Sequence, residues 1–584
     1  MKFRPEDPSR IAGQGAAAGP QPAADARAAG AMLNACDALL GRALGRGLRD
    51  APALIHHDSV YTYGALAATV DRFGLALKEA GLTTGERVLF MLKDTPELVA
   101  GFLAAIKAGG VAIALNTRYA AADLRYAIAD SGARMLFIDP DFLPVLEQAV
   151  AEGARRPSLL VVCGADANPT APVIALETFL GDRGGTLDSA PTAPDDMAFW
   201  IYTSGTTGMP KAAMHRHRDV LLADRHMGEM FGIKAGDKLF SSSKLFFSFA
   251  LTHCLLGGLR LGASLILDDR WPRGEAIAEI VARHRPDVMF SVPTIYRNLL
   301  AEGHAESEPF RAVRCFVSAG ERLPANLFER WQAATGKPIF DGIGATETLF
   351  LFLANTPAAC RAGATGRPQP DVELRLVDDR DRPISEPGKL GVLWVRMGSI
   401  AAGYWNQPEK SRASFDRGWY RTGDMFSFDA DGWWYHHGRG DDLLKISGQW
   451  VSPLEIEDCA LATPGVNDVA VVGVPNEDGL TRLTMFVVAA ADRDKAALAT
   501  QIQDRLKASL SIYKCPRNIL FVDEVPRTAT GKLQRFRLRA LAEALRGEGA
   551  GASPAPAPRP LGRELSRAAA PGHAASAAGR SSSS

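Results

Sequence analysis

Cysteine is scarce in this sequence, and long apolar runs are missing. Seven cysteines are dispersed among 584 residues, with no CxxC pair and no His/Cys spacing typical of a metal site. Such an odd, scattered set predicts buried free thiols in a reducing compartment rather than disulfides. No stretch of about eighteen apolar residues occurs, since Lys107 interrupts the best candidate at 98–115, so no membrane helix is expected. The first residues include Glu6 and Asp7 and lack the apolar core of a signal peptide, which predicts a cytoplasmic protein.

Excess charge and the motifs of several enzyme classes are missing too. Lys plus Arg and Asp plus Glu number 66 each, which gives no electrostatic reason to expect nucleic acid or an anionic membrane as a partner. No Gly-Lys pair is followed by Ser or Thr, so there is no Walker A loop. Neither GxSxG nor HExxH occurs, and hydrolase chemistry is therefore unsupported.

Length and composition predict several compact units between disordered ends. The 584 residues exceed one domain, because domains typically hold roughly 100–200 residues. The ends, 1–30 and 546–584, are rich in Ala, Gly, Pro, Arg and Ser, and have too few large apolar residues to offset chain entropy. Between these tails we expect a large domain over 31–437, a hinge over 438–442 and a small domain over 443–545.

Strand and helix patterns alternate through the folded part. A strand pattern over 87–92 precedes a helix that starts at Thr95-Pro96 and stops at Gly109-Gly110, and a second strand follows over 111–115. Similar units over 134–163 predict an α/β fold with parallel sheets and crossover helices. In the small domain, strands over 469–474, 483–488 and 518–522 accompany a helix over 495–510, capped by Asp494.

One string combines small, hydroxyl-bearing and basic residues in a way that suits a polyphosphate. It consists of Tyr202, Thr203, Ser204, Gly205, Thr206, Thr207, Gly208, Met209, Pro210 and Lys211. The glycines let backbone N–H groups approach the ligand, the hydroxyls donate hydrogen bonds and Lys211 supplies a cation. By composition alone, a flexible surface loop explains it better. The ordered string resembles the phosphate loop of the acyl-adenylate-forming superfamily, which includes acyl-CoA synthetases, peptide-synthetase adenylation domains and luciferases.

Four further strings follow in the order of that superfamily, although each alone would be an ordinary turn, helix cap or surface ion pair. The strings are Ser318-Ala319-Gly320-Glu321, Asp341-Gly342-Ile343-Gly344-Ala345-Thr346-Glu347, Tyr420 to Asp424 with Arg439 beyond it, and Pro526 to Lys532. The resemblance implies that the first two strings form the adenine pocket, with Ile343 in place of the usual aromatic residue. It also implies that Thr346 meets the α-phosphate and that Asp424 and Arg439 bind the ribose. Glu347, with Thr203, would hold Mg²⁺, and carboxylate oxygen is a ligand that this hard cation prefers.

The resemblance covers about 50–540 and implies a mechanism and a fold. The implied fold is a large N-terminal α/β domain of mixed sheets with a small mobile C-terminal α+β domain. ATP and coenzyme A are the implied co-substrates, and Mg²⁺ the implied cofactor. Lys532 would neutralise charge while the acyl-adenylate forms. The small domain would then rotate about Asp441 and replace Lys532 with the segment of Lys445, Ser447 and Gly448, where Gly448 leaves room for the pantetheine arm.

Finer strings, such as 244–249, 444–448 and 532–536, resemble the benzoate-CoA ligases. The acid pocket that this resemblance implies consists of Phe247, Ser248, Phe249, Gly344, Phe350 and Leu351. Benzoate-type enzymes often have tyrosine at the position of Phe249 and histidine at that of Phe350. Two phenylalanines predict that benzoate and small apolar derivatives outperform hydroxybenzoates, unless Ser248 or Thr348 faces the ring.

Several alternatives share these motifs. The acid could be another compact ring acid or a medium-size apolar acid, and a stand-alone adenylation enzyme would load a carrier protein instead of CoA. A luciferase-like monooxygenase would need a different acid pocket. A non-catalytic nucleotide sensor would be expected to lose Lys532, Glu347 or Asp424, and all three are present. We therefore expect an AMP-forming acid–thiol ligase that binds small molecules as a monomer or homodimer.

Overall fold

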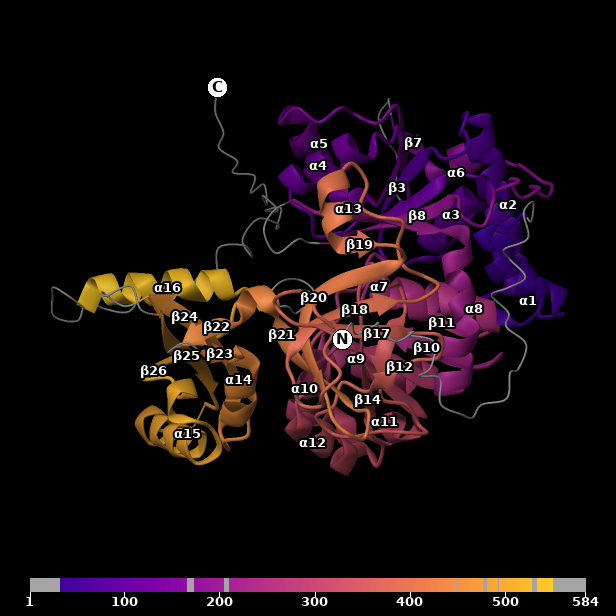
Figure 1. The fold of residues 1–584 in the computed structure, drawn as a ribbon. Coiled ribbons are helices and arrows are strands. Elements are labelled where there is room, and N and C mark those ends of the chain that lie inside the picture. The colour runs from indigo at the N-terminus through magenta and orange to yellow at the C-terminus, as the bar shows by residue number, and fades with distance from the viewer. Residues whose placement is uncertain are drawn as a thin grey trace, which may run out of the picture.

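The protein is described from a computed structural model, which covers residues 32–164, 173–203, 209–446, 449–475, 481–491, 493–527 and 533–549. The predicted tails lie outside these residues, apart from the end of the last helix. The α/β fold class is confirmed: a large region with several sheets lies beside a smaller α+β region, drawn in orange to yellow in Figure 1.

The first sheet contains the βαβ units that the sequence predicts. Its seven strands run in the order β7-β6-β5-β3-β4-β8-β9, and all pair in parallel except the β8–β9 hairpin. The strands are β3 (Arg87–Met91), β4 (Val111–Ala114), β5 (Met135–Ile138), β6 (Leu159–Val162), β7 (Ile174–Ala175), β8 (Met197–Thr203) and β9 (Lys211–Arg216). The helices of this part are α2 (Tyr63–Glu79), α3 (Pro96–Lys107), α4 (Ala121–Ser131), α5 (Leu143–Ala151) and α6 (Leu176–Leu180).

The second sheet has nine strands in the order β16-β15-β14-β13-β12-β10-β11-β1-β2, parallel in the middle and antiparallel at both edges. They are β1 (Pro52–His56), β2 (Ser59–Thr62), β10 (Lys238–Ser241), β11 (Ser264–Leu267), β12 (Val288–Ser291), β13 (Cys315–Ser318), β14 (Ile339–Gly344), β15 (Leu351–Ala354) and β16 (Arg367–Pro368). The helical segments near it are η3 (Asp37–Gly41), α1 (Arg42–Gly45), η5 (His217–Leu222), η6 (Asp224–Glu229), α7 (Ser248–Ala250), η7 (Leu251–Leu256), α8 (Gly257–Leu261), α9 (Gly274–His284), α10 (Pro293–Ala301), η8 (His304–Glu306), α11 (Glu308–Ala312) and α12 (Ala325–Thr335).

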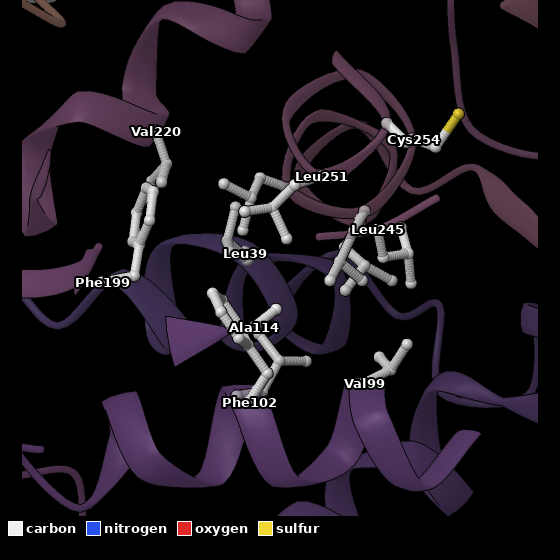
Figure 2. Close-up of a cluster of buried hydrophobic side chains, with 14 of the residues drawn as sticks. Leu39, Val99, Phe102, Ala114, Phe199, Val220, Leu245, Leu251 and Cys254 are labelled. Atoms are coloured by element: carbon white, nitrogen blue, oxygen red, sulfur yellow. The ribbon is translucent and has the colours of Figure 1, made fainter. Parts of the chain in front are cut away.

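The largest hydrophobic core joins these two sheets. Figure 2 shows Val99 and Phe102 of α3 on the side of the helix that faces Leu245 and Leu251. Burial of each side chain of this size stabilises the fold by roughly 1.5–3 kcal/mol. The core therefore fixes the two sheets relative to each other, and with them the segments that leave their strand ends.

A third, antiparallel sheet was not expected from the sequence. Its strands are β17 (Glu373–Val377), β18 (Gly391–Arg396), β19 (Phe415–Asp416), β20 (Trp419–Phe428) and β21 (Trp434–Arg439), and α13 (Pro408–Ser414) precedes β19. In the β20–β21 pair, Asp424 lies opposite Arg439. The sheet thus brings together two residues that the sequence assigns to the same ligand.

The short helix η9 (Gly440–Asp442) lies within the predicted hinge, and the small region begins after it. It contains β22 (Leu444–Ile446), β23 (Gln449–Val451), α14 (Pro453–Leu461), β24 (Val466–Pro475), β25 (Thr481–Ala489), α15 (Lys495–Ser509), η10 (Ile512–Lys514), β26 (Asn518–Phe521) and α16 (Arg535–Gly549). Asp494 caps α15, as predicted, because its side chain accepts a hydrogen bond from the Ala496 N–H. A separate core that includes Val471, Met485 and Ile502 holds these elements together.

The cysteines are all free, as predicted, and four of the seven are buried. Cys360 is exposed, so the expectation of buried thiols is wrong for this residue. Among the residues that the structure describes, no helix is long and apolar enough to cross a membrane.

A buried ion pair fixes the segment that follows residue 532. The Arg535 guanidinium contacts the Glu457 carboxylate at 2.5 and 3.0 Å and donates a further hydrogen bond, 2.6 Å long, to the Val471 carbonyl. Glu457 Oε1 also accepts from the Val471 N–H at 2.6 Å. The two side chains are less than one-tenth exposed, so loss of either partner leaves an uncompensated buried charge. Arg535 thus anchors the start of α16 to α14 and β24.

We expect Arg535→Ala to destabilise the small region by about 3–5 kcal/mol, because it leaves the buried Glu457 carboxylate without a counter-charge. Urea unfolding of the full chain, followed by hydrogen exchange in peptides from α14, β24 and α16, measures the effect. Arg537→Ala, at an exposed position on the same helix, is the control and should change stability little. Equal effects of the two substitutions would contradict the assigned role of Arg535.

Candidate active site

A cavity of about 750 Å³ lies between the large and small regions. Residues from the first four strings singled out in the sequence line it, although they are far apart along the chain. These residues are Thr203, Lys211, Gly320, Glu321, Asp341, Gly342, Ile343, Gly344, Ala345, Thr346, Glu347, Tyr420, Asp424 and Arg439. From the small region, Arg527 of the fifth string lines the cavity, together with Leu533 and Gln534, which follow that string. The fold therefore brings the predicted nucleotide-binding residues together.

The β8–β9 hairpin places the ends of the first string at the cavity. Thr203 lies opposite Lys211 in the ladder, and the connecting residues Ser204, Gly205, Thr206, Thr207 and Gly208 lie outside the described residues. The Lys211 ammonium lies 4.2 Å from the centroid of the Tyr404 ring, within the range of a cation–π contact. This positive charge suits a phosphate-bearing ligand.

Glu347 presents a carboxylate that is only 5% exposed. The Tyr404 hydroxyl donates a hydrogen bond of 2.5 Å to its Oε1, and burial together with Glu347 raises the pKa of Tyr404 above its usual value, so the tyrosine stays a donor. Within the described part of the chain, no donor lies in hydrogen-bond range of Oε2. A buried carboxylate with one oxygen uncommitted at a cavity wall fits a hard divalent cation such as Mg²⁺.

Thr346 is held through its backbone by a buried histidine. His215 Nε2 donates to the Thr346 carbonyl at 2.8 Å, and Nδ1 lies 3.1 Å from Asp219 Oδ2. Both His215 and Asp219 are fully buried. Sequence motifs did not reveal these two residues, although His215 follows closely on the phosphate loop in the chain.

The turn after Glu347 is strained and tightly bonded. Leu349 has φ of 65°, in the left-handed region that branched and bulky residues rarely occupy. The Thr348 hydroxyl accepts from the Ala345 N–H at 2.9 Å and lies 3.1 and 3.0 Å from the carbonyls of Ala345 and Phe350. Thr348 is thus committed to the turn and does not serve a substrate ring.

The glycines of the second string have a packing role. A Cβ on Gly344 would lie 2.9 Å from the Phe350 carbonyl, and one on Gly342 would lie 2.9 Å from the Leu353 carbonyl. Such contacts are closer than real side chains tolerate, so glycine is needed where β15 approaches β14.

The ribose-side residues lie on the antiparallel sheet. Asp424 Oδ1 is 3.5 Å from Arg439 Nη1 and 3.4 Å from His436 Nε2, and Arg439 also donates to the Thr422 carbonyl at 2.8 Å. Gly423 has φ of 75°, and a Cβ there would lie 2.9 Å from the Arg439 guanidinium. His436, which the sequence did not indicate, therefore belongs to this cluster and lines the cavity.

The adenine-side string continues from β13 into a turn at Gly320. Ser318 and Ala319 are buried, and Thr294 Oγ1 donates to Glu321 Oε2 at 2.8 Å. Burial raises the pKa of both the Glu321 and the Asp341 carboxyl groups. Ile343 is half-buried at the cavity wall, where an apolar side chain can cover a ring face.

The small region approaches the cavity through polar contacts. Arg527 lies 3.1 Å from Asp468 and 3.9 Å from Glu321, so it joins both regions. Arg297 of the large region pairs with the same Asp468 at 3.3 Å. Lys532 lies outside the described residues, but Arg527 and Leu533 on either side of its loop line the cavity. Ser447, Gly448 and the side chains of Asp441 and Lys445 also lie outside the described residues.

Of the predicted acid-pocket residues, only Gly344 lines the large cavity. Phe247, Ser248 and Phe249 are half-buried. Ser248 Oγ lies 3.5 Å from Thr346 Oγ1, so this segment contacts the residue predicted to meet the α-phosphate. Phe350 is fully buried. Leu351 and Phe352 on the adjoining strand are also core residues.

Comparisons with known proteins agree with this geometry. Residues 42–405 match the model of the AMP-binding enzyme family, and residues 455–532 match that of the AMP-binding enzyme C-terminal domain. A 3-hydroxybenzoate–CoA ligase of Aromatoleum sp. (strain CIB) is 52% identical over 88% of this chain and 97% of its own length. A 3-hydroxybenzoate–CoA/4-hydroxybenzoate–CoA ligase of Thauera aromatica is 49% identical over 88% of this chain and 98% of its own length.

A solved structure shows the same fold. The benzoate CoA ligase from Burkholderia xenovorans LB400 superposes with a TM-score of 0.79 at 35% identity, over 87% of this chain and all of that one. The family models cover both regions that form the cavity, and the relatives match along nearly their whole length. The chain therefore belongs to the AMP-binding enzymes of the acyl-adenylate-forming superfamily, and within them it is most like the benzoate-CoA ligases.

Proposed function

We propose that the protein is an ATP-dependent aryl-carboxylate–CoA ligase whose best substrate is 3-hydroxybenzoate. The observation that supports ligation of an aryl acid most strongly is the proximity of Thr346 and Ser248, whose hydroxyl oxygens are 3.5 Å apart. It places a segment of aromatic residues directly beside the predicted α-phosphate contact. An aryl acid in that segment would have its carboxylate next to the phosphate it must attack.

In the first half-reaction, a carboxylate oxygen attacks the α-phosphorus of ATP and the bond to pyrophosphate breaks. Positioning and charge neutralisation are the main tasks of the protein in this step. Lys211 and Lys532 would balance charge on the phosphates, and Asp424 with Arg439 would hold the ribose. Glu347 and Thr203 would hold Mg²⁺, which supplies Lewis-acid stabilisation of the phosphate oxygens when bound.

In the second half-reaction, the thiolate of CoA attacks the acyl carbon, a C–S bond forms and AMP leaves with the shared oxygen. Lys532 must move away to admit the thiol, and Lys445, Ser447 and Gly448 would take its place. The contacts that Arg527 makes with Glu321 and Asp468 support the interpretation that the structure has the conformation for adenylate formation. In this conformation, the residues on both sides of Lys532 line the cavity.

The choice of 3-hydroxybenzoate rests on the relatives named above, two of which act on it. Phe249 and Phe350 alone favour benzoate, as the sequence predicted. Since the relatives match along nearly their whole length, we give their substrate more weight than these two side chains. The experiment is a comparison of kcat/KM for 3-hydroxybenzoate, 4-hydroxybenzoate, benzoate, 2-aminobenzoate and hexanoate, with ATP, Mg²⁺ and CoA.

The expected order places 3-hydroxybenzoate first and hexanoate last, with AMP, diphosphate and the aryl-CoA formed in equal amounts. A preference for hexanoate would contradict the aryl assignment. Adenylate formation without transfer to CoA would instead favour an enzyme that loads a carrier protein.

Lys532→Ala should slow adenylate formation by roughly 10²–10³-fold, because one preorganised charge at the reacting phosphate is lost. Transfer of a supplied aryl-AMP to CoA should persist, since Lys532 has left the site in that step. Pyrophosphate release and thioester formation are measured separately. Lys507→Ala, an exposed position on α15, is the control. Equal loss in both half-reactions would refute the role of Lys532.

Asp441→Pro should spare pyrophosphate release and abolish most thioester formation. Asp441 lies in the 3₁₀ helix of Gly440–Asp442, whose φ values are near those that proline imposes, so the present arrangement is allowed while rotation is obstructed. Asp441→Ala is the matched control and should retain both half-reactions. If proline lowers both half-reactions alike in a folded protein, the hinge assignment is wrong.

A further inference from the structure

A buried histidine lies behind the two phenylalanines of the acid pocket. His253 is 2% exposed and follows Phe249 by one helical turn, in the π-helical segment Leu251–Leu256. Its ring centroid lies 5.0 Å from that of Phe249 and 5.8 Å from that of Phe350. Segments of π-helix are rare and frequently occur at functional sites. An imidazole is thus enclosed by the side chains proposed to hold the substrate ring.

The hydrogen bond at one ring nitrogen determines what the other can do. His253 Nδ1 lies 3.0 Å from the Phe249 carbonyl oxygen, which can only accept, so Nδ1 carries the proton. Burial lowers the pKa of His253 to about 4, and the ring is neutral near pH 7. Nε2 therefore has a lone pair and is an acceptor. In the portion of the chain described by the structure, no donor lies within hydrogen-bond distance of it.

Three other polar side chains near the pocket already have partners. Thr348 bonds within its own turn. The two nitrogens of His226, which also packs against the Phe350 ring, contact the carbonyl oxygens of Leu351 at 3.2 Å and Pro370 at 2.9 Å. Ser248 faces Thr346 at the phosphate end. His253 Nε2, in contrast, is an acceptor with no donor among the described residues, and it can serve a group at the end of a bound ring opposite the carboxylate.

We propose that His253 Nε2 accepts a hydrogen bond from the ring hydroxyl of the aryl acid, and that this bond selects hydroxybenzoates over benzoate. The inference rests on the proposed function. The carboxylate would lie near Thr346, the ring between Phe249 and Phe350, and the hydroxyl at His253. Benzoate would leave the buried Nε2 without a donor, and an unsatisfied buried acceptor lowers affinity by about 10–100-fold.

The first test compares His253→Phe with the unmodified protein, using kcat/KM for 3-hydroxybenzoate and for benzoate. Phenylalanine fills the ring volume but offers no acceptor. The ratio of the two values should fall about 10-fold or more, with benzoate turnover retained. His253→Gln, which keeps an acceptor, should restore part of the ratio. An unchanged ratio, or an equal loss for both acids, would overturn the proposal.

His226→Phe is the matched contrast, because His226 contacts the same Phe350 ring but binds backbone carbonyls. It should affect both acids alike. A change of the ratio as large as that in His253→Phe would show that the effect is not specific to His253, and would overturn the proposal.

The unmodified protein provides a test that does not depend on the folding of a variant. 3-Aminobenzoate can donate a hydrogen bond, whereas 3-fluorobenzoate and 3-methoxybenzoate cannot. We expect 3-aminobenzoate to exceed benzoate in kcat/KM and the other two acids to give no advantage. A fluoro or methoxy acid that matches 3-hydroxybenzoate would overturn the role of His253. Absence of any aryl-CoA from all these acids would instead refute the proposed function itself.

Discussion

The site depends on the hydrogen bonds that hold the turn from Gly344 to Phe350. His215 binds the Thr346 carbonyl, the Ala401 N–H binds that of Glu347, and the Ser399 hydroxyl binds that of Thr348. These bonds keep Leu349 in a left-handed conformation that bulky residues disfavour. As a result, the turn presents Thr346 and Glu347 to the cavity and keeps Phe350 buried. In the proposed function, this one segment would set the distance between the nucleotide and the acid.

The contacts between the two regions are of a different physical kind. The large region has a continuous apolar core across two sheets, whereas the small region joins it through ion pairs and single hydrogen bonds, such as Arg297 with Asp468 and Asn326 with the Leu461 carbonyl. Partly buried ion pairs of this kind contribute little net free energy, because the loss of hydration of the two charges offsets much of their attraction. Separation of the regions therefore costs far less than disruption of either core. This difference suits an enzyme whose second step needs another arrangement of the small region.

Much of the fold and the nucleotide cavity could be predicted from the sequence, because that information is local. The helix start at Thr95-Pro96 and the cap at Asp494 follow from short strings, and the resemblance of such strings to a known superfamily implied the convergence of Lys211, Asp424 and Glu347. Side chains that act through contacts between distant segments could not be predicted. Tyr404 reaches Glu347 across 57 positions and His215 reaches Thr346 across 131. The antiparallel sheet of β17–β21 and the orientation of His253 were missed for the same reason: they depend on which segments pack together, which no single string specifies.

The central claim is that the acid is activated as an acyl-adenylate. It can be tested with 3-hydroxybenzoate that carries ¹⁸O in its carboxylate, incubated with the protein, ATP, Mg²⁺ and CoA. Mass spectrometry of the nucleotide product gives the answer. The account predicts AMP with one ¹⁸O atom, because the oxygen that attacks the α-phosphorus remains on it when the thiolate displaces AMP. Unlabelled AMP, or ADP together with ¹⁸O-labelled phosphate, would contradict it.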